Sequence, residues 1–167
     1  MGIIDEKFSG NKLGFFLQSL LATVAVFIVL LFLDPAVHSA VLPPLGASAF
    51  IAFTMPHLKE SQPRCLLGGY TIGIIIATIC YFLSITQFVT NIEFIANHSN
   101  VIFCSVAIGL AIFLMVITNT EHPPAAGMAL GLFLNKPDHR TVIVIMVGII
   151  SLVVIKSLLR SYLKDLC

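Results

Sequence analysis

The stretch from Asn119 to Gly127 separates two apolar runs, and its paired prolines restrict the fold more than any other feature. Pro123 and Pro124 have no N–H group, and a residue before a proline is disfavoured in the α region, so a helix cannot continue through this point. Prolines are accepted in the first turn of a new helix. We therefore expect extended backbone, a break, and a short helix starting near Ala125. Inside a bilayer such a break must be packed in protein or line a wet cavity, which makes it the best candidate for a functional site.

The composition indicates the solvent in which the chain folds. Hydrophobic residues make up 58% of the chain and charged residues only 10%, and the mean hydropathy is +1.04. These values are typical of an integral membrane protein rather than a soluble domain. We expect one all-α transmembrane domain over residues 1–167, in contact with the lipid bilayer. The net charge of +1 indicates no nucleic-acid partner. A chain this short is expected to form a homo-oligomer if it is to bury a polar pathway.

Six helices are expected from the apolar runs and the prolines that interrupt them. Four are long enough to span a bilayer, and their expected ranges are 13–33, 66–89, 101–117 and 141–159. Two are half-helices that follow a Pro-Pro pair, at 45–55 and 125–134. At about 1.5 Å per residue, a half-helix reaches only about half of the hydrocarbon thickness.

The two halves of the chain resemble each other. A shift of 80 positions places Pro43-Pro44 on Pro123-Pro124 and the first half-helix on the second. We therefore expect internal repeats at about 13–89 and 101–167, although two prolyl pairs could also match by chance. Interrupted segments in corresponding positions of two repeats indicate a transporter site.

The relation between the halves depends on whether the half-helices cross the membrane. If each dips in and returns, the chain has four spans, and the basic residues of loops 57–64 and 135–140 lie opposite the termini. If each crosses, there are six crossings and inverted halves, and loop 57–64 shares the cytoplasmic side with both termini. The positive-inside bias favours the inverted arrangement. The expected location is a bacterial plasma membrane, and Lys156 is expected to extend to the headgroups.

Inverted half-helices would bring their N-termini together near the midplane. Each N-terminus has free N–H groups and about half a positive charge, so the pair could hold a small anion without a buried cation. Ser48 could add a hydroxyl donor. The alternative is that the small residues here only allow close helix packing. The residues expected to bind the anion are Pro44, Gly46, Ala47, Ser48, His122, Pro123, Pro124, Ala126 and Gly127.

Three stretches resemble, in order, the conserved blocks of the HPP family of integral membrane proteins. They are Pro-Pro-Leu-Gly-Ala-Ser-Ala at 43–49, Gln-Pro-Arg at 62–64 followed by Gly68-Gly69, and His-Pro-Pro-Ala-Ala-Gly-Met-Ala-Leu at 122–130. Family members are described as having four transmembrane helices, and plastid and cyanobacterial members are implicated in nitrite transport. The resemblance therefore implies a transporter or channel for a small inorganic anion. The family motif usually continues as Ala-Gly-Ala-Thr after the prolines, whereas Met128 here replaces the hydroxyl residue, which weighs against nitrite itself.

Three ionisable residues near the break are candidates for further roles. Desolvation should favour the neutral forms of Glu121 and His122, and either could bind a proton together with the anion. Alternatively, Glu121 caps the following helix or lies on the surface, and His122 bonds to backbone freed by the break. Arg64 could attract anions at the pathway mouth, or simply anchor the topology.

Other classes of protein stay open. The chain is not expected to be an enzyme, to use a cofactor or to bind a metal, because no histidines have metal-ligand spacing. An intramembrane enzyme could nevertheless use Glu121 and His122 as an acid–base pair. A structural or regulatory subunit would need no polar site at all. The sequence does not distinguish a channel from a coupled carrier, nor does it identify the anion.

Overall fold

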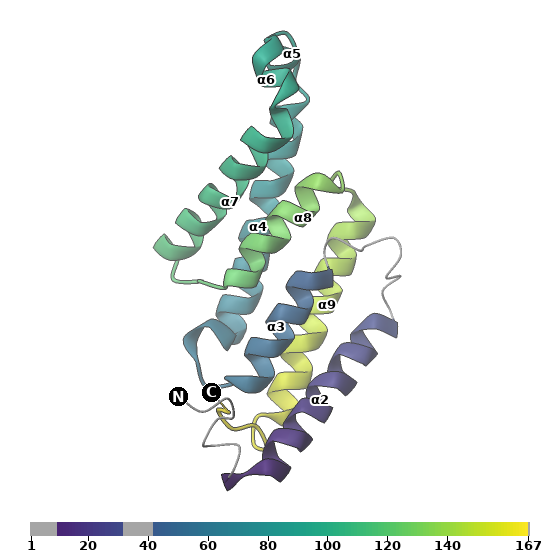
Figure 1. Cartoon of the computed structure of the whole chain (residues 1–167), viewed down its shortest axis with the longest axis vertical. Coiled ribbons are helices and arrows are strands. Elements are labelled where there is room, and N and C mark those ends of the chain that lie inside the picture. The colour runs from purple at the N-terminus through teal and green to yellow at the C-terminus, as the bar shows by residue number, and fades with distance from the viewer. Residues whose placement is uncertain (1–9, 32–41, 167) are drawn as a thin grey trace.

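The computed structural model describes residues 10–31 and 42–166 (Figure 1). Within these ranges every element is helical, which confirms the all-α fold. The four long apolar helices are α2 (Lys12–Leu31), α4 (Pro63–Ser84), α7 (Ser99–Ile117) and α9 (His139–Leu159). The two half-helices are α3 (Leu42–Thr54) and α8 (Pro123–Leu134), and the short elements are η1 (Lys59–Ser61), α5 (Gln87–Thr90) and α6 (Glu93–Asn97).

Several helix boundaries differ from the expected ones. The half-helices include their prolines, since α8 starts at Pro123 rather than near Ala125, with His122 extended just before it (φ −145°, ψ 95°). The long helix α4 ends at Ser84 instead of residue 89, and the expected loop 90–100 contains α6. At this end the hydroxyls of Ser84 and Thr86 bond to the carbonyls of Tyr81 and Leu83.

Successive helices alternate in direction, as Figure 1 shows. In that view α2, α4 and α8 run upward, and α3, α7 and α9 run downward. The first half is therefore up-down-up and the second down-up-down, which is the order of an inverted repeat with six crossings. The repeat boundaries at 13–89 and 101–167 stay a prediction.

The central helix is α4, which packs against α7, α8 and α9. Its glycines allow the second half to approach very closely. A Cβ atom on Gly69 would lie 2.9 Å from His122 Cβ, and one on Gly73 would lie 2.8 Å from the Ala125 carbonyl oxygen. The segment before α8 and the first turn of α8 therefore lie directly on the α4 backbone.

The end of α7 turns the chain into this segment. Asn119 has a left-handed backbone (φ 57°), and Asn119 N donates to Val116 O while Thr120 N donates to Met115 O. This is the Schellman arrangement that ends many helices, with asparagine in place of the usual glycine. It places Thr120 against Gly68 and His122 against Gly69 of α4.

One end of the molecule gathers the start of α2, the end of α3 and the C-terminal segment. Gln18 is buried, and its amide donates to the carbonyls of Phe53 and Lys164 while accepting from Lys164 N. Leu166 N donates to Thr54 O at 2.8 Å. The turn between α8 and α9 lies away from this end, at the upper end of α8 and α9, while α5 and α6 form the far end of the molecule (Figure 1).

Candidate functional site

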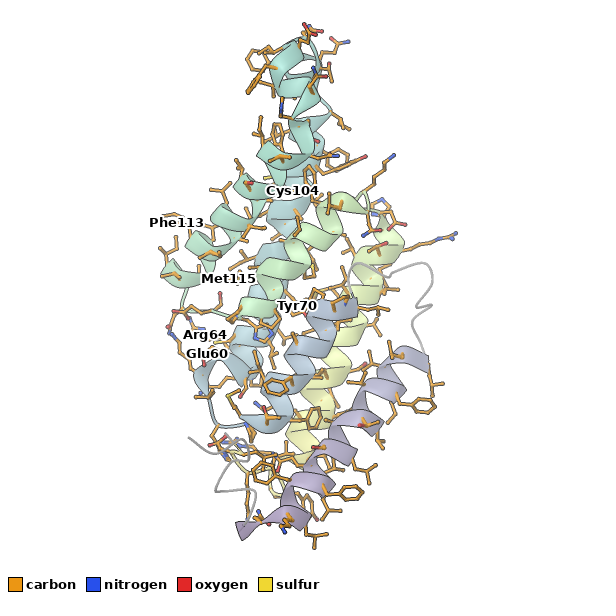
Figure 2. The ribbon with its side chains drawn as sticks, viewed as in Figure 1. Glu60, Arg64, Tyr70, Cys104, Phe113 and Met115 are labelled. Atoms are coloured by element: carbon orange, nitrogen blue, oxygen red, sulfur yellow. The ribbon has the colours of Figure 1, made fainter. Side chains whose placement is uncertain are left out.

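The first turns of α3 and α8 lie side by side, and three buried polar side chains join them. Ser48 Oγ lies 2.7 Å from His122 Nε2 and 2.9 Å from the Tyr70 hydroxyl. Ser48 and Tyr70 are fully buried, and His122 is 1% exposed. Figure 2 shows Tyr70 at the level where α8 begins beside α3. Tyr70 is about 10 Å along α4, which is about 33 Å long, while the start of α3 packs against Gly148 at the middle of α9.

The contacts of His122 determine where its proton is. His122 Nδ1 lies 2.8 Å from the Glu60 carbonyl oxygen, which can only accept, so Nδ1 carries a hydrogen. In the neutral ring, Nε2 accepts from Ser48, and the Tyr70 hydroxyl donates to Ser48. In the protonated ring, Nε2 donates to Ser48, whose hydrogen then turns to the Pro44 carbonyl at 3.0 Å. The trio can therefore gain or release a proton without losing a hydrogen bond.

Three consecutive residues of η1 each hold a polar side chain from the second half of the chain. Lys59 forms an ion pair with Glu121 at 2.8 Å. The Glu60 carbonyl accepts from His122, and Ser61 accepts from Lys156 through both its carbonyl and its hydroxyl. This 3-10 turn therefore fixes the position of the break relative to α9.

Glu121 does not share the buried environment of His122. Its carboxylate bonds to the Lys59 ammonium, and this contact holds the pKa of Glu121 below its usual value. The expectation that desolvation would keep Glu121 neutral is therefore wrong. Nor does Glu121 cap α8, because the N-cap residue is His122, which makes no side-chain capping bond. The two residues point to different partners and do not form an acid–base pair.

The other two basic residues of interest are engaged in the fold. Arg64 donates to the Thr118 carbonyl at 3.1 Å, next to the turn that ends α7. Figure 2 places Arg64 and Glu60 together near the start of α4. Lys156 is only 5% exposed and bonds to Ser61, so its side chain turns into the protein instead of extending outward along the lipid-facing surface as expected.

Of the remaining predicted residues, some lie at the junction of α3 and α8 and others lie away from it. Pro44 and Pro124 are buried, and a Cβ atom on Gly127 would lie 4.0 Å from Pro44 Cγ, so these residues lie at the junction of α3 and α8. Gly46 faces the opposite way, toward α2, and Ala47 is exposed.

A cavity of about 310 Å³ borders the trio on the α7 side. His122, Pro123, Ala126 and Glu121 line it from the break and α8, and its other lining residues come from α7 and include Met115. The volume is about ten times that of one water molecule in the liquid. Among the residues that the structure describes, no group of histidine, cysteine, aspartate or glutamate is placed to hold a metal ion.

Comparison with known proteins assigns the chain to a family. The family described as HPP, transmembrane region, matches residues 9–165. The chain belongs to the HPP transmembrane family. It is also 32% identical over 85 residues to a transmembrane protein of Dictyostelium discoideum, a match that covers 51% of this chain and 27% of that protein. The chain thus spans well under two thirds of this relative. No solved structure matches significantly.

The HPP protein contains two site contributors that the sequence did not reveal. Tyr70 lies in an apolar helix, next to the Gly68-Gly69 pair of a stretch that resembles a family block, and nothing in the sequence singled it out. The Glu60 carbonyl contacts His122 because of the backbone conformation around η1, and no residue type could have indicated it.

Proposed function

We propose that this HPP-family protein moves a small inorganic anion such as nitrite across the membrane, at the junction of α3 and α8. The observation that carries the proposal is the meeting of two half-helix N-terminal turns around a buried trio of Ser48, Tyr70 and His122. Helix N-termini favour negative charge. Burial of these polar groups is tolerated because each one is hydrogen-bonded.

The cavity beside His122 gives the anion a place next to these helix ends. Its lining is mostly apolar, so an ion there would be largely dehydrated. Pro123 and Pro124 have no N–H, Ala125 N bonds to the His122 carbonyl and both His122 ring nitrogens are bonded, so the ion would depend on the α8 dipole and on the charge of protonated His122. Glu121 also lines this cavity, but its charge is offset by Lys59 at 2.8 Å. Local repulsion of the anion is thereby reduced.

His122 is proposed to couple anion movement to a proton. Protonation adds one positive charge beside the cavity, and the trio accommodates it by reversing the Ser48 hydrogen bond. A proton and a monovalent anion entering together leave the net charge of the site unchanged, which lowers the cost of crossing hydrocarbon.

The protein is further proposed to work as a homo-oligomer in a bacterial plasma membrane, with both termini cytoplasmic. The orientation follows from the basic residues at the end of the molecule that carries the start of α2 and the C-terminal segment. A role as a subunit without transport, or as an enzyme, would give different results in the assay below.

Anion flux into proteoliposomes tests the proposal directly. Nitrite, nitrate, formate, bicarbonate and chloride are compared for wild-type protein, His122→Gln and the exposed control His98→Gln. We expect flux of at least one anion that increases with an inward proton gradient. His122→Gln should reduce this flux by about tenfold or more, the effect of losing roughly one strong hydrogen bond. His98→Gln should not change it.

Two results would contradict the proposal. If the flux of all five anions equals that of protein-free liposomes, the protein does not transport them, and the subunit and enzyme alternatives remain. Flux that is the same for His122→Gln and wild type would remove the trio from the pathway. Flux that is independent of the proton gradient, with His122→Gln still impaired, would remove only the coupling.

A further inference from the structure

A second cavity lies away from the trio, where α4 begins and α9 ends. Its volume is about 300 Å³, and its lining comes from the segment after α3, the start of α4 and the last turn of α9. The polar residues that line it are His57, Gln62, Lys156, Ser157 and Arg160. Two of them, Lys156 and Arg160, are basic, and the cavity contains no acidic lining residue among those described.

The buried member of this cluster, Lys156, forms no ion pair among the residues that the structure describes. Its ammonium group donates to the carbonyl and the hydroxyl of Ser61, which are both neutral acceptors, and an ammonium has a third hydrogen to donate. Within the described part of the chain, no carboxylate lies within ion-pair distance of Lys156. The neighbouring Asp165 carboxylate is already bound to His57, at 3.2 Å from the ring and 3.1 Å from the backbone N. An unbalanced ammonium that is 95% buried is costly, and an anion in the cavity would offset that cost.

The second cation is placed to act together with the first. Arg160 follows Lys156 by one helical turn, so both side chains lie on the same face of α9. The guanidinium group suits two oxygens of one oxyanion. Gln62 adds an amide donor at the start of α4, where the helix dipole is positive. Basic residues near a helix C-terminus commonly only complement its dipole, but that role does not require Lys156 to be buried.

We propose that this cavity binds a phosphate-like oxyanion between Lys156 and Arg160. Because it lies at the ends of two spanning helices, it is at the depth of lipid headgroups. The oxyanion is therefore either the phosphate of an anionic phospholipid or a free ion from the adjacent aqueous phase. The site does not depend on transport, and a binding measurement tests it without any flux.

The experiment compares Arg160→Gln with Arg140→Gln. Both arginines are exposed, and Arg140 lies in the first turn of the same helix, at its opposite end, so it controls for the loss of one charge. Delipidated protein in neutral detergent is titrated separately with phosphatidylglycerol, phosphatidylcholine and inorganic phosphate. Thermal stability and native mass spectrometry report binding, and the melting temperature without ligand shows that each variant is folded. Lys156→Gln is measured alongside as a more severe variant.

Saturable binding to the wild type, weakened about tenfold or more by Arg160→Gln and unchanged by Arg140→Gln, is the expected result. Binding of phosphatidylglycerol alone identifies a lipid headgroup as the source of the oxyanion, and binding of inorganic phosphate identifies a free ion. The proposal is overturned if neither ligand binds, or if wild type and Arg160→Gln give the same titration.

Discussion

At the scale of single residues, Ser48 joins the two halves of the protein through one hydroxyl group. Its oxygen lies within hydrogen-bond distance of His122, Tyr70 and the Pro44 carbonyl, in a region that water does not reach. A buried polar group left without a partner costs about 1–3 kcal/mol. The hydroxyl therefore stabilises the junction of α3 and α8 by keeping its neighbours satisfied.

Replacing this hydroxyl should destabilise the protein more than its size suggests. Ser48→Ala leaves His122 Nε2 without a hydrogen-bond donor and the Tyr70 hydroxyl without an acceptor, so we expect a loss of about 1–3 kcal/mol. Ser105→Ala is the matched control, because Ser105 is exposed and bonds only to the Val101 carbonyl of its own helix. Thermal unfolding in detergent measures both variants. Equal melting temperatures for the two would show that the trio contributes no stability.

At the residue level, the sequence indicated polar residues of the break but could not test their role. Ser48 was named as a possible hydroxyl donor and His122 as an ionisable residue at the break, and both lie at the junction of α3 and α8, while their part in anion binding stays a prediction. Lys156 and Glu121 were misjudged. Their burial and pairing depend on Ser61 and Lys59, which are distant in sequence and come close only through the path of η1.

At the scale of helices, the glycines of α4 decide how closely the second half can approach. Gly73 lies against the backbone of Ala125, which belongs to the first turn of α8 and cannot move without moving the break. Gly109, on α7, has no atom within 4 Å of the position where a Cβ would be. The two glycines thus have opposite structural roles although both lie in apolar helices.

This difference predicts opposite effects of the same substitution. In Gly73→Ala the new methyl group would lie 2.8 Å from the Ala125 carbonyl oxygen, so α8 must shift. Such overpacking costs about 1–3 kcal/mol. Gly109→Ala should be neutral or stabilise by up to about 1 kcal/mol, because alanine favours helix and nothing obstructs it. Thermal unfolding of both variants checks the prediction, and a neutral Gly73→Ala would mean that α8 is not held against α4.

The sequence predicted the helices well where it contained a strong local signal. Apolar length located the four long helices, and the prolines located α3 and α8 to within about three residues. The end of α4 was misplaced because the apolar run continues past Ser84, where the helix ends. Hydropathy alone does not locate a helix end inside an apolar run.

At the scale of the whole molecule, the alternating directions of the six helices place the polar loops at two ends. His57 lies beside the C-terminal segment, to which it is bound through Asp165, while Lys136 lies away from it, in the turn at the upper end of α8 and α9. Exposed apolar residues cover the sides between these ends, as Phe113 does on the outer face of α7 in Figure 2. This distribution is that of a protein with lipid around its sides and water at its ends.

Accessibility of introduced cysteines tests this orientation in a membrane. In a background without the four native cysteines, His57→Cys and Lys136→Cys are labelled with a membrane-impermeant maleimide in right-side-out and inside-out vesicles. Six crossings place the two positions on opposite sides, so each should be labelled in only one type of vesicle, and Lys164→Cys should be labelled together with His57→Cys. If the half-helices instead dipped in and returned, His57→Cys and Lys136→Cys would react from the same side. That result would contradict the inverted repeat. Only antiparallel halves direct two half-helices, α3 and α8, toward one point from opposite faces of the bilayer.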